Sequence, residues 1–224
     1  MSEKNITKFP IASSDEYLKD KAVDYKTLSL MTLYSNLNPP KLDQGVEEFY
    51  RYLYRNKLTS NQEEIEQLSN AKMNTILKNV KRLTKLENRL VTFDNTEHGI
   101  VYYINYTNEL GVDYVTIPED MLKFLINTSN SNTIKTYILM KYMCRDKGKI
   151  MTREYIAGKI GLSAKSHNSL LTISHITKSL ENNHFIKKKI VYNTHTIDGR
   201  EVTKQSIEYS VVEREEWKQL NNFK

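Results

Sequence analysis

The stretch TISHITKSLENNHFIKKKIV, residues 172–191, joins a helical pattern to a strand pattern across a short polar break. Ile173, Ile176 and Leu180 recur at spacings of three and four residues, which places them on one face of a helix. After the break, Phe185 begins an apolar run that is interrupted by three lysines and then continues. The stretch therefore predicts a helix that packs on a core through one face, followed by a strand with a cationic base.

The residues on either side of this stretch complete a set of three helices and a hairpin. TIKTYILMKYMCR (133–145) predicts a first helix, and MTREYIAGKIG (151–161) predicts a second helix with Thr152 as its N-cap. The helix in the quoted stretch is the third. Two alternating runs then flank a loop that contains an Asp-Gly pair at 198–199, a strong signal for a hairpin turn.

The same order of elements recurs in the first half of the chain. VEEFYRYLYRNK (46–57) predicts a helix, because its apolar and aromatic residues fall on one helical face. LTSNQEEIEQLS (58–69) predicts a second helix with its N-cap in the Thr-Ser pair at 59–60, and KMNTILKNVKRLTKLENRL (72–90) predicts a third. LVTFDNTEHGIVYYINY (90–106) predicts a hairpin. We therefore infer an internal structural repeat.

Outside the two copies the sequence is less regular. Residues 1–40 are polar without a sustained period, which indicates a partly ordered arm. Between the copies, VDYVTIPEDMLKFLINTSNSN (112–132) predicts a strand, a helix that begins at Pro118, and a linker. The predicted fold is α+β and mostly helical. Its parts are an arm (1–40), a first domain of three helices plus a β-hairpin (41–111), a strand–helix connector (112–132), and a second such domain with a C-terminal helix (133–224).

The composition limits the classes of protein to which the chain can belong. Its 224 residues are 39% hydrophobic and 27% charged, which is typical of a folded globular protein. No apolar run approaches the roughly 20 residues that a bilayer span requires, and the polar start is not a signal peptide. A single cysteine, Cys144, excludes an internal disulfide and suits a reducing compartment. We therefore expect a cytoplasmic protein with no membrane partner.

Recognisable catalytic and cofactor motifs are missing from the sequence. It has no Walker motif, no GxGxxG, no GxSxG and no pair of carboxylates on a catalytic frame. His167 and His175 have no carboxylate or cysteine at ligand spacing, which argues against a metal site. We therefore expect no enzyme activity, no cofactor and no metal. The net charge of +6 indicates a nucleic-acid partner only where cations gather on one element, as they do in 72–90.

The stretch from Thr133 to Val212 resembles the winged helix–turn–helix family. GKIMTREYIAGKIGLS followed by ISHITKSLENNHFIKKK is similar to that family's second helix, turn, recognition helix and first wing strand. The residues AKSHNS make the turn a few residues longer than is usual in the family. Residues 46–106 are similar, with a compressed turn at 70–71. The resemblance implies that each copy presents its third helix to double-stranded DNA, with the hairpin, or wing, beside the groove.

The polar side chains of these elements form the expected site. On the second copy's third helix, Asn could pair with adenine, and Ser or Thr could contact several bases, while lysines at the wing base neutralise phosphates. Wing residues could reach an adjacent groove. The DNA-binding residues expected in the second copy are Lys165, Ser166, Asn168, Ser169, Thr172, His175, Lys187, Lys188, Lys189, His195, Arg200 and Lys204. In the more cationic first copy they are Lys72, Asn74, Thr75, Lys78 and Arg82.

In its size, its tandem pattern and its richness in Asn, Lys, Ile and Tyr, the chain resembles tandem winged-helix proteins of plasmids and phages. These proteins act as replication initiators, replisome organisers and regulators. The function expected from this resemblance is a replication initiator that binds repeats at an origin. One alternative is a transcriptional regulator of a mobile element. Another is a replisome-organising or helicase-loading adaptor that acts by contacts with replication proteins. Either both copies bind DNA, or one copy has become a surface for self-association or for a partner.

Overall fold

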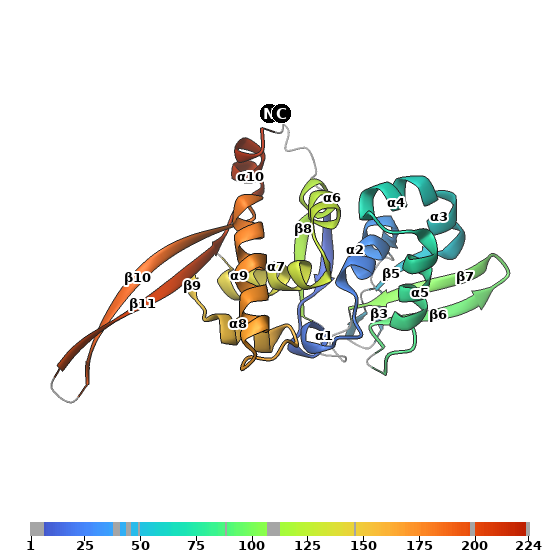
Figure 1. Cartoon of the computed structure of the whole chain (residues 1–224). Helices are drawn as coiled ribbons and strands as arrows, with labels where there is room; N and C mark the ends of the chain where they lie inside the picture. Colours follow the sequence, from blue (N-terminus) through green and yellow to red (C-terminus); the bar gives the residue numbers. More distant parts are fainter. Residues whose placement is uncertain are drawn as a thin grey trace. The chain divides into compact units, whose positions relative to one another are not determined.

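The structure is a computed structural model that describes residues 7–37, 41–43, 46–48, 50–87, 89–106, 113–145, 147–197 and 200–222. It is α+β, as expected, with ten helices and several antiparallel sheets among these residues (Figure 1). The chain divides into two compact units, Met1–Ile134 and Lys135–Lys224, and the boundary falls within helix α7. Within the described ranges, no helix has both the length and the apolar character needed to cross a membrane.

Unit 2 combines helices with a long hairpin and a short edge strand. Its elements are α7 (Ser131–Cys144, shared with unit 1), β9 (Lys149–Ile150), α8 (Arg153–Lys159), α9 (His167–Asn182), β10 (Ile186–Ile197), β11 (Arg200–Val211) and α10 (Arg214–Leu220). Strands β10 and β11 pair antiparallel along their whole length, and β9 pairs with the other edge of β11. The helices and hairpin predicted for the second copy are confirmed. The predicted turn at 198–199 lies outside the described residues.

Local signals explain where the helices of unit 2 begin and end. The Thr152 hydroxyl accepts a hydrogen bond from the backbone N–H of Tyr155 at 3.1 Å and so caps the start of α8, as predicted. After α9, His184 adopts a left-handed φ of 58°. The N–H of Phe185 donates to the carbonyl of Leu180 at 2.9 Å. This closing turn directs the chain from α9 into β10.

The core of unit 2 joins α7, α9, the base of the hairpin and α10. The apolar stripe predicted for α9 is confirmed, and the buried residues of this helix are Ile173, Ile176, Thr177 and Leu180. The Phe185 ring centroid lies 5.0 Å from that of Tyr137 and 5.7 Å from that of Trp217. The Trp217 indole also donates a hydrogen bond to the carbonyl of Asn183 at 3.2 Å. Helix α10 therefore packs against the residues that follow the C-terminal end of α9.

Unit 1 contains the remaining elements. They are β1 (Lys8–Ala12), α1 (Asp15–Lys19), α2 (Tyr25–Tyr34), β2 (Asn36–Leu37), β3 (Lys41–Asp43), β4 (Val46–Glu48), β5 (Tyr50–Tyr54), α3 (Arg55–Ser60), α4 (Gln62–Ser69), α5 (Met73–Leu83), β6 (Val91–Thr96), β7 (Gly99–Asn105), β8 (Tyr114–Pro118) and α6 (Glu119–Thr128). They form a four-stranded sheet in the order β2-β5-β7-β6 and the strand pairs β1-β8 and β3-β4. The hairpin predicted for 90–106 is confirmed as β6 and β7.

The two units share one order of helices and strands. In unit 1 the shared elements are α2, β5, α4, α5, β6 and β7, with the additional strands β2, β3 and β4 between α2 and β5 and the short α3 after β5. In unit 2 they are α7, β9, α8, α9, β10 and β11. In both units the strand before the helix pair hydrogen-bonds to the second strand of the hairpin, so that β5-β7-β6 corresponds to β9-β11-β10. An internal recurrence is present, but in unit 1 it begins at α2.

The helix predicted for residues 46–57 is wrong. These residues form strands β4 and β5, and a helix begins only at Arg55. Burial along β5 alternates, with Arg51 and Leu53 inward and Tyr50, Tyr52 and Tyr54 partly exposed. A helical pattern assigns Arg51 to a solvent face, whereas in the strand it points inward and breaks the apolar alternation that would have indicated a strand. Helix α3 also runs through Ser60, so the Thr-Ser pair does not cap the next helix.

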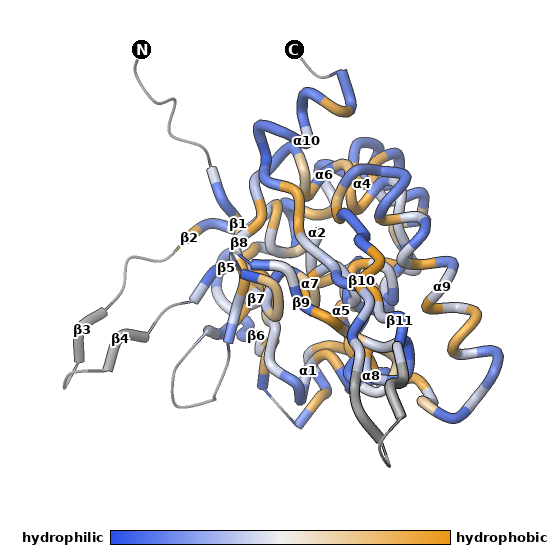
Figure 2. Tube along the Cα trace, turned by 90° about the vertical axis from the view of Figure 1, so that its left-hand side faces the viewer, coloured by the Kyte–Doolittle hydropathy of each residue, from blue (hydrophilic) through white to orange (hydrophobic). Residues whose placement is uncertain are grey.

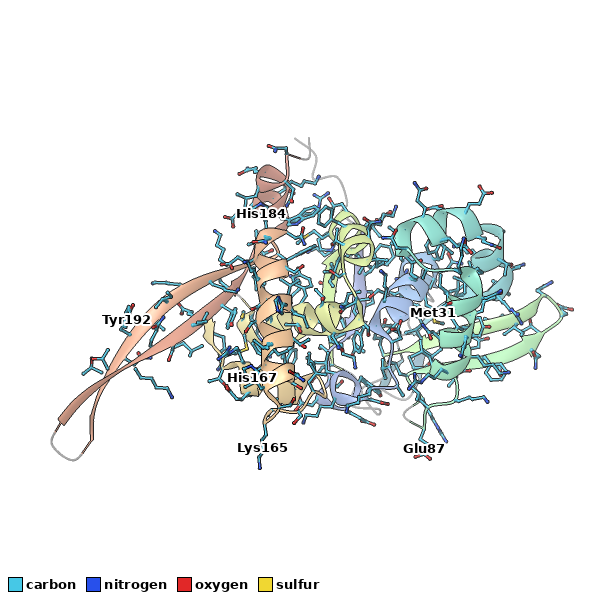
Figure 3. All side chains as sticks on the ribbon, in the orientation of Figure 1. Met31, Glu87, Lys165, His167, His184 and Tyr192 are labelled. Atoms are coloured by element: carbon cyan, nitrogen blue, oxygen red, sulfur yellow. The ribbon has the colours of Figure 1, made fainter. Side chains whose placement is uncertain are left out.

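The segments predicted as an arm (1–40) and a connector (112–132) are integral parts of unit 1 wherever they are described, which corrects that prediction. Strand β1 pairs antiparallel with β8. Met31 of α2 is fully buried, and it lies among the helices of unit 1 in Figure 3. Helix α2 is buried on nearly all sides, including Ser29 and Thr32, so it lacks the amphipathic period by which a surface helix is recognised. The strand and helix predicted in the connector are confirmed as β8 and α6.

Candidate nucleic-acid interface

Helix α9 presents a polar face opposite its buried stripe. Its apolar and polar residues alternate along the trace in Figure 2. The exposed residues of this face are His167, Asn168, Leu171, Thr172, His175 and Lys178. Of the residues predicted on the helix, Asn168, Thr172 and His175 belong to this face. Ser169 is half-buried and lies toward its edge.

The hydrogen bonds within α9 determine what this face can offer to a ligand. The Thr172 hydroxyl donates to the backbone carbonyl of Asn168 at 2.8 Å, which leaves its oxygen as an acceptor and its methyl group exposed. The amide of Asn168 has both donor and acceptor groups, and no described residue bonds to its side chain. Asn168 is therefore the side chain on α9 best suited to bidentate hydrogen bonding with a base edge.

The residues just before α9 extend this face. Lys165 is exposed and Ser166 is half-buried, and Ser166 makes no side-chain capping bond to the helix. Figure 3 shows Lys165 and His167 together at the N-terminal end of α9, with His184 at the opposite end. Lys165 thus lies at the same end of α9 as Asn168.

Helix α8 is linked to α9 by a hydrogen bond, in which Arg153 of α8 donates to the Ser174 hydroxyl at 3.2 Å.

The lysines at the base of the hairpin are not equivalent. Lys187 forms an ion pair with Glu216, and Lys188 forms one with Glu181 at 3.0 Å. Lys189 is exposed and makes no ion pair with a described residue. Lys204 on β11 is also exposed. Two of the three predicted phosphate contacts thus already have acidic partners, which lowers the gain that each could make from a phosphate.

Two further predictions concern the end of the wing. The backbone of β10 passes through His195, and β11 begins at Arg200. The side chains of both residues lie outside the described part of the structure. Closer to the core, Tyr192 stands 69% exposed on β10, away from the helices (Figure 3).

The site predicted from the sequence omits three members of the α9 face, His167, Leu171 and Lys178. Leu171 is 42% exposed although it is apolar. It was overlooked because the leucines of an amphipathic helix are ordinarily assigned to the core. Helical spacing gave the signal, because 171, 175 and 178 follow one another at intervals of four and three residues, opposite Ile173 and Ile176.

In unit 1 the corresponding helix is α5. Asn74, Thr75, Lys78 and Arg82 are all exposed on it, as predicted for a contact face. Lys72, just before the helix, forms an ion pair with Glu66 at 3.3 Å. Glu66 also accepts a hydrogen bond from the backbone N–H of Met73 at 2.7 Å, and this bond is the main reason why the pKa of Glu66 is lowered. Glu66 thus holds the start of α5 in place.

Two further kinds of candidate group are metal-binding clusters and the single cysteine. The described residues contain no cluster of three or more His, Cys, Asp or Glu that could hold a metal ion. Cys144 is buried, and its thiol donates a hydrogen bond to the carbonyl of Tyr209 at 3.3 Å. Burial raises the pKa of the Cys144 thiol to about 11, which disfavours the reactive thiolate.

Comparisons of the chain with models of protein families, with curated proteins and with solved structures found no match.

Proposed function

We propose that the protein binds double-stranded DNA sequence-specifically, through α9 and the hairpin β10–β11 of unit 2. The observation that carries the proposal is the polar outer face of α9, which includes Asn168, Thr172 and His175. This face lies next to a hairpin whose base carries Lys189, which makes no ion pair with a described residue. The shared order of elements in the two units also supports the resemblance to tandem winged helix–turn–helix proteins.

In this proposal, some residues of the site contact the phosphate backbone of DNA and others contact the edges of its bases. Lys165, Lys178 and Lys189 contact phosphates, because they are exposed and make no ion pair with a described residue. Asn168 and Thr172 contact base edges in the major groove, which admits a helix. His175, further along α9, adds a hydrogen bond to a base or a phosphate.

For the biological role we propose the initiation of plasmid or phage replication at an origin with repeated binding sites. The support is the presence, in one chain, of two units that share an order of helices and strands, as in the tandem proteins that the sequence resembles. A transcriptional regulator would contact DNA through the same residues, but at a promoter instead of an origin. Mapping the bound sites on the host element separates the two roles, because an initiator occupies an array of repeats at the origin and a regulator occupies a promoter.

The test of DNA recognition is selection of bound fragments from random duplex DNA with the full chain. A common sequence should emerge among the selected fragments. Asn168→Ala and Thr172→Ala should each retain binding to random DNA but reduce discrimination, by about 1–3 kcal/mol for each lost base contact. Gln219→Ala, which removes an exposed polar group on α10, serves as the matched control. Unaltered discrimination in both α9 variants would show that α9 does not read the sequence.

A further inference from the structure

In unit 1, the inner face of hairpin β6–β7 is only partly covered by the core, so the rest of this face is open to solvent. Phe93 and Tyr102 stand opposite each other on this face and line a groove of about 640 Å³ between the hairpin and α5. Tyr102 is buried, whereas Phe93 is 47% exposed. Leu77 of α5 and Ile100 of β7, both half-buried, complete the apolar floor. The groove, called the α5–hairpin groove below, thus leaves an aromatic side chain and its apolar neighbours open to solvent.

The rim of the α5–hairpin groove is cationic. Arg55, Lys78 and Lys81 line it and are exposed, and no acidic residue is among its described lining residues. None of these three cations makes an ion pair with a described residue. An occupant of this groove must therefore offer apolar surface to the floor and negative charge to the rim.

From this complementarity we propose that the α5–hairpin groove binds an acidic, amphipathic helix of a partner protein. Such a helix inserts apolar side chains spaced three and four residues apart into a hydrophobic groove, while carboxylates on its flanks meet the surrounding cations. Duplex DNA fits less well, because it presents charged phosphates and polar base edges, with thymine methyl groups as the main apolar feature of its major groove. Aromatic side chains are enriched at protein interfaces and often act as binding anchors.

The proposal changes the expected role of α5. Asn74 and Lys78, predicted from the sequence as DNA contacts, line the groove and would face the partner helix. The DNA-reading face of α9 lies in the other unit and shares no residue with the groove. Peptide binding and DNA reading can therefore succeed or fail separately, so the inference goes beyond the proposed function and does not rest on it.

The experiment is a selection of 16-residue peptides from a displayed random library against the full chain. The enriched peptides should combine apolar residues at helical spacing with flanking Asp and Glu. Their affinity is then measured with synthetic, fluorescently labelled copies by anisotropy. Phe93→Ser should weaken binding about tenfold or more, as expected for a central aromatic anchor. Because Phe93 is half-exposed, unit 1 should remain folded, and thermal unfolding of the variant checks this.

Charge reversal provides the second arm. The double variant Lys78→Glu with Lys81→Glu should lose the acidic peptide and gain affinity for a version with Lys in place of its acids. Asp94→Ala is the matched control, because Asp94 is exposed on the opposite face of β6 and outside the groove. It should bind the peptide as the unaltered chain does.

Three results would overturn the proposal. The first is a selection without enrichment of such peptides. The second is equal peptide affinity in the unaltered chain and Phe93→Ser. The third is loss of binding to random-sequence duplex DNA in Phe93→Ser, together with full competition between that DNA and the peptide, which would assign the groove to DNA.

Discussion

Arg51 shows how one side chain can change the interpretation of a segment. It is only 8% exposed, and its guanidinium donates to the hydroxyl of Ser35 at 2.7 Å and to the Ser35 carbonyl at 2.8 Å. It also lies over the ring of Phe9, 5.1 Å from the centroid. These contacts satisfy a charge that would otherwise be costly to bury. They explain why Arg51 can occupy an inward position of strand β5.

We predict that Arg51→Met destabilises unit 1. The substitution keeps much of the apolar stem but leaves the buried carbonyl of Ser35 without this donor, at a cost of about 1–3 kcal/mol. Urea unfolding followed by circular dichroism measures the change. Arg82→Met, at an exposed position of α5, should stay within about 0.5 kcal/mol of the original chain. Equal stability of the two variants would contradict the role given to Arg51.

Leu171 is the apolar residue at the centre of an otherwise polar face, and under the proposed function it should contact a thymine methyl group. Replacing that thymine with deoxyuracil removes one methyl group and should weaken binding by about 0.8 kcal/mol, or roughly fourfold. Anisotropy titrations of matched duplexes measure this effect. Leu171→Ala should bind the two duplexes with similar affinity. If every thymine in the site can be replaced without effect on the unaltered chain, Leu171 does not read DNA.

At the scale of elements, the hairpin of unit 2 is cationic in sequence but partly neutralised in the structure. Lys187 is paired with Glu216 of α10, whereas Lys189 makes no ion pair with a described residue. We predict that Lys189→Ala weakens binding to all DNA sequences alike and reduces the slope of log K against log salt by about 0.9. Lys187→Ala should change the slope less. A larger effect at Lys187 would show that its pairing with Glu216 does not persist in solution.

The thiol of Cys144, at the end of helix α7, is buried, and this burial makes the stability of the fold depend on pH. Its folded-state pKa of about 11 exceeds the ordinary value of 9.0, so between these values the unfolded chain loses its thiol proton first. Stability should therefore fall as the pH rises from about 9 to 11. Comparing the pH dependence of urea unfolding with that of Cys144→Ala isolates this contribution. The native thiol should also resist Ellman's reagent at pH 8, and rapid labelling of the folded chain would contradict its burial.

At the scale of the whole molecule, the net charge of +6 is the sum of cations and acids that are unevenly placed. The acids Glu181 and Glu216 neutralise lysines at the base of hairpin β10–β11, whereas the lysines on and before α9 have no such partners among the described residues. Under the proposed function, association with DNA should therefore depend on a limited set of cations. Net charge alone would not distinguish these from the paired ones.

The corresponding prediction concerns the salt dependence of the full chain. If Lys165, Lys178 and Lys189 each neutralise one phosphate, log K for random duplex DNA should fall with log salt at a slope of about −2.7 or steeper. Titrations at several salt concentrations measure the slope. A slope close to zero would mean that the chain does not bind the DNA backbone, and would remove the basis of the proposed function.

The sequence by itself determined the elements whose patterns are local. The stripe of α9, the hairpin after it, the Thr152 cap and the helix after Pro118 all follow from spacing and capping within a few residues. The outward position of Asn168 and Thr172 follows from the same stripe, because the opposite side of an amphipathic helix faces solvent.

Only the tertiary structure decided the features that depend on distant partners. Helix α2 is enclosed on nearly all sides, and β1 becomes a strand by pairing with β8 about a hundred residues away, so neither carries a strong local period. Arg51 points inward because it can hydrogen-bond to Ser35 and lie over the ring of Phe9. Lys187 is paired and Lys189 is not, among the described residues, because Glu216 lies within reach of Lys187 alone. Burial and pairing are properties of three-dimensional neighbours, which a local pattern of residues does not contain.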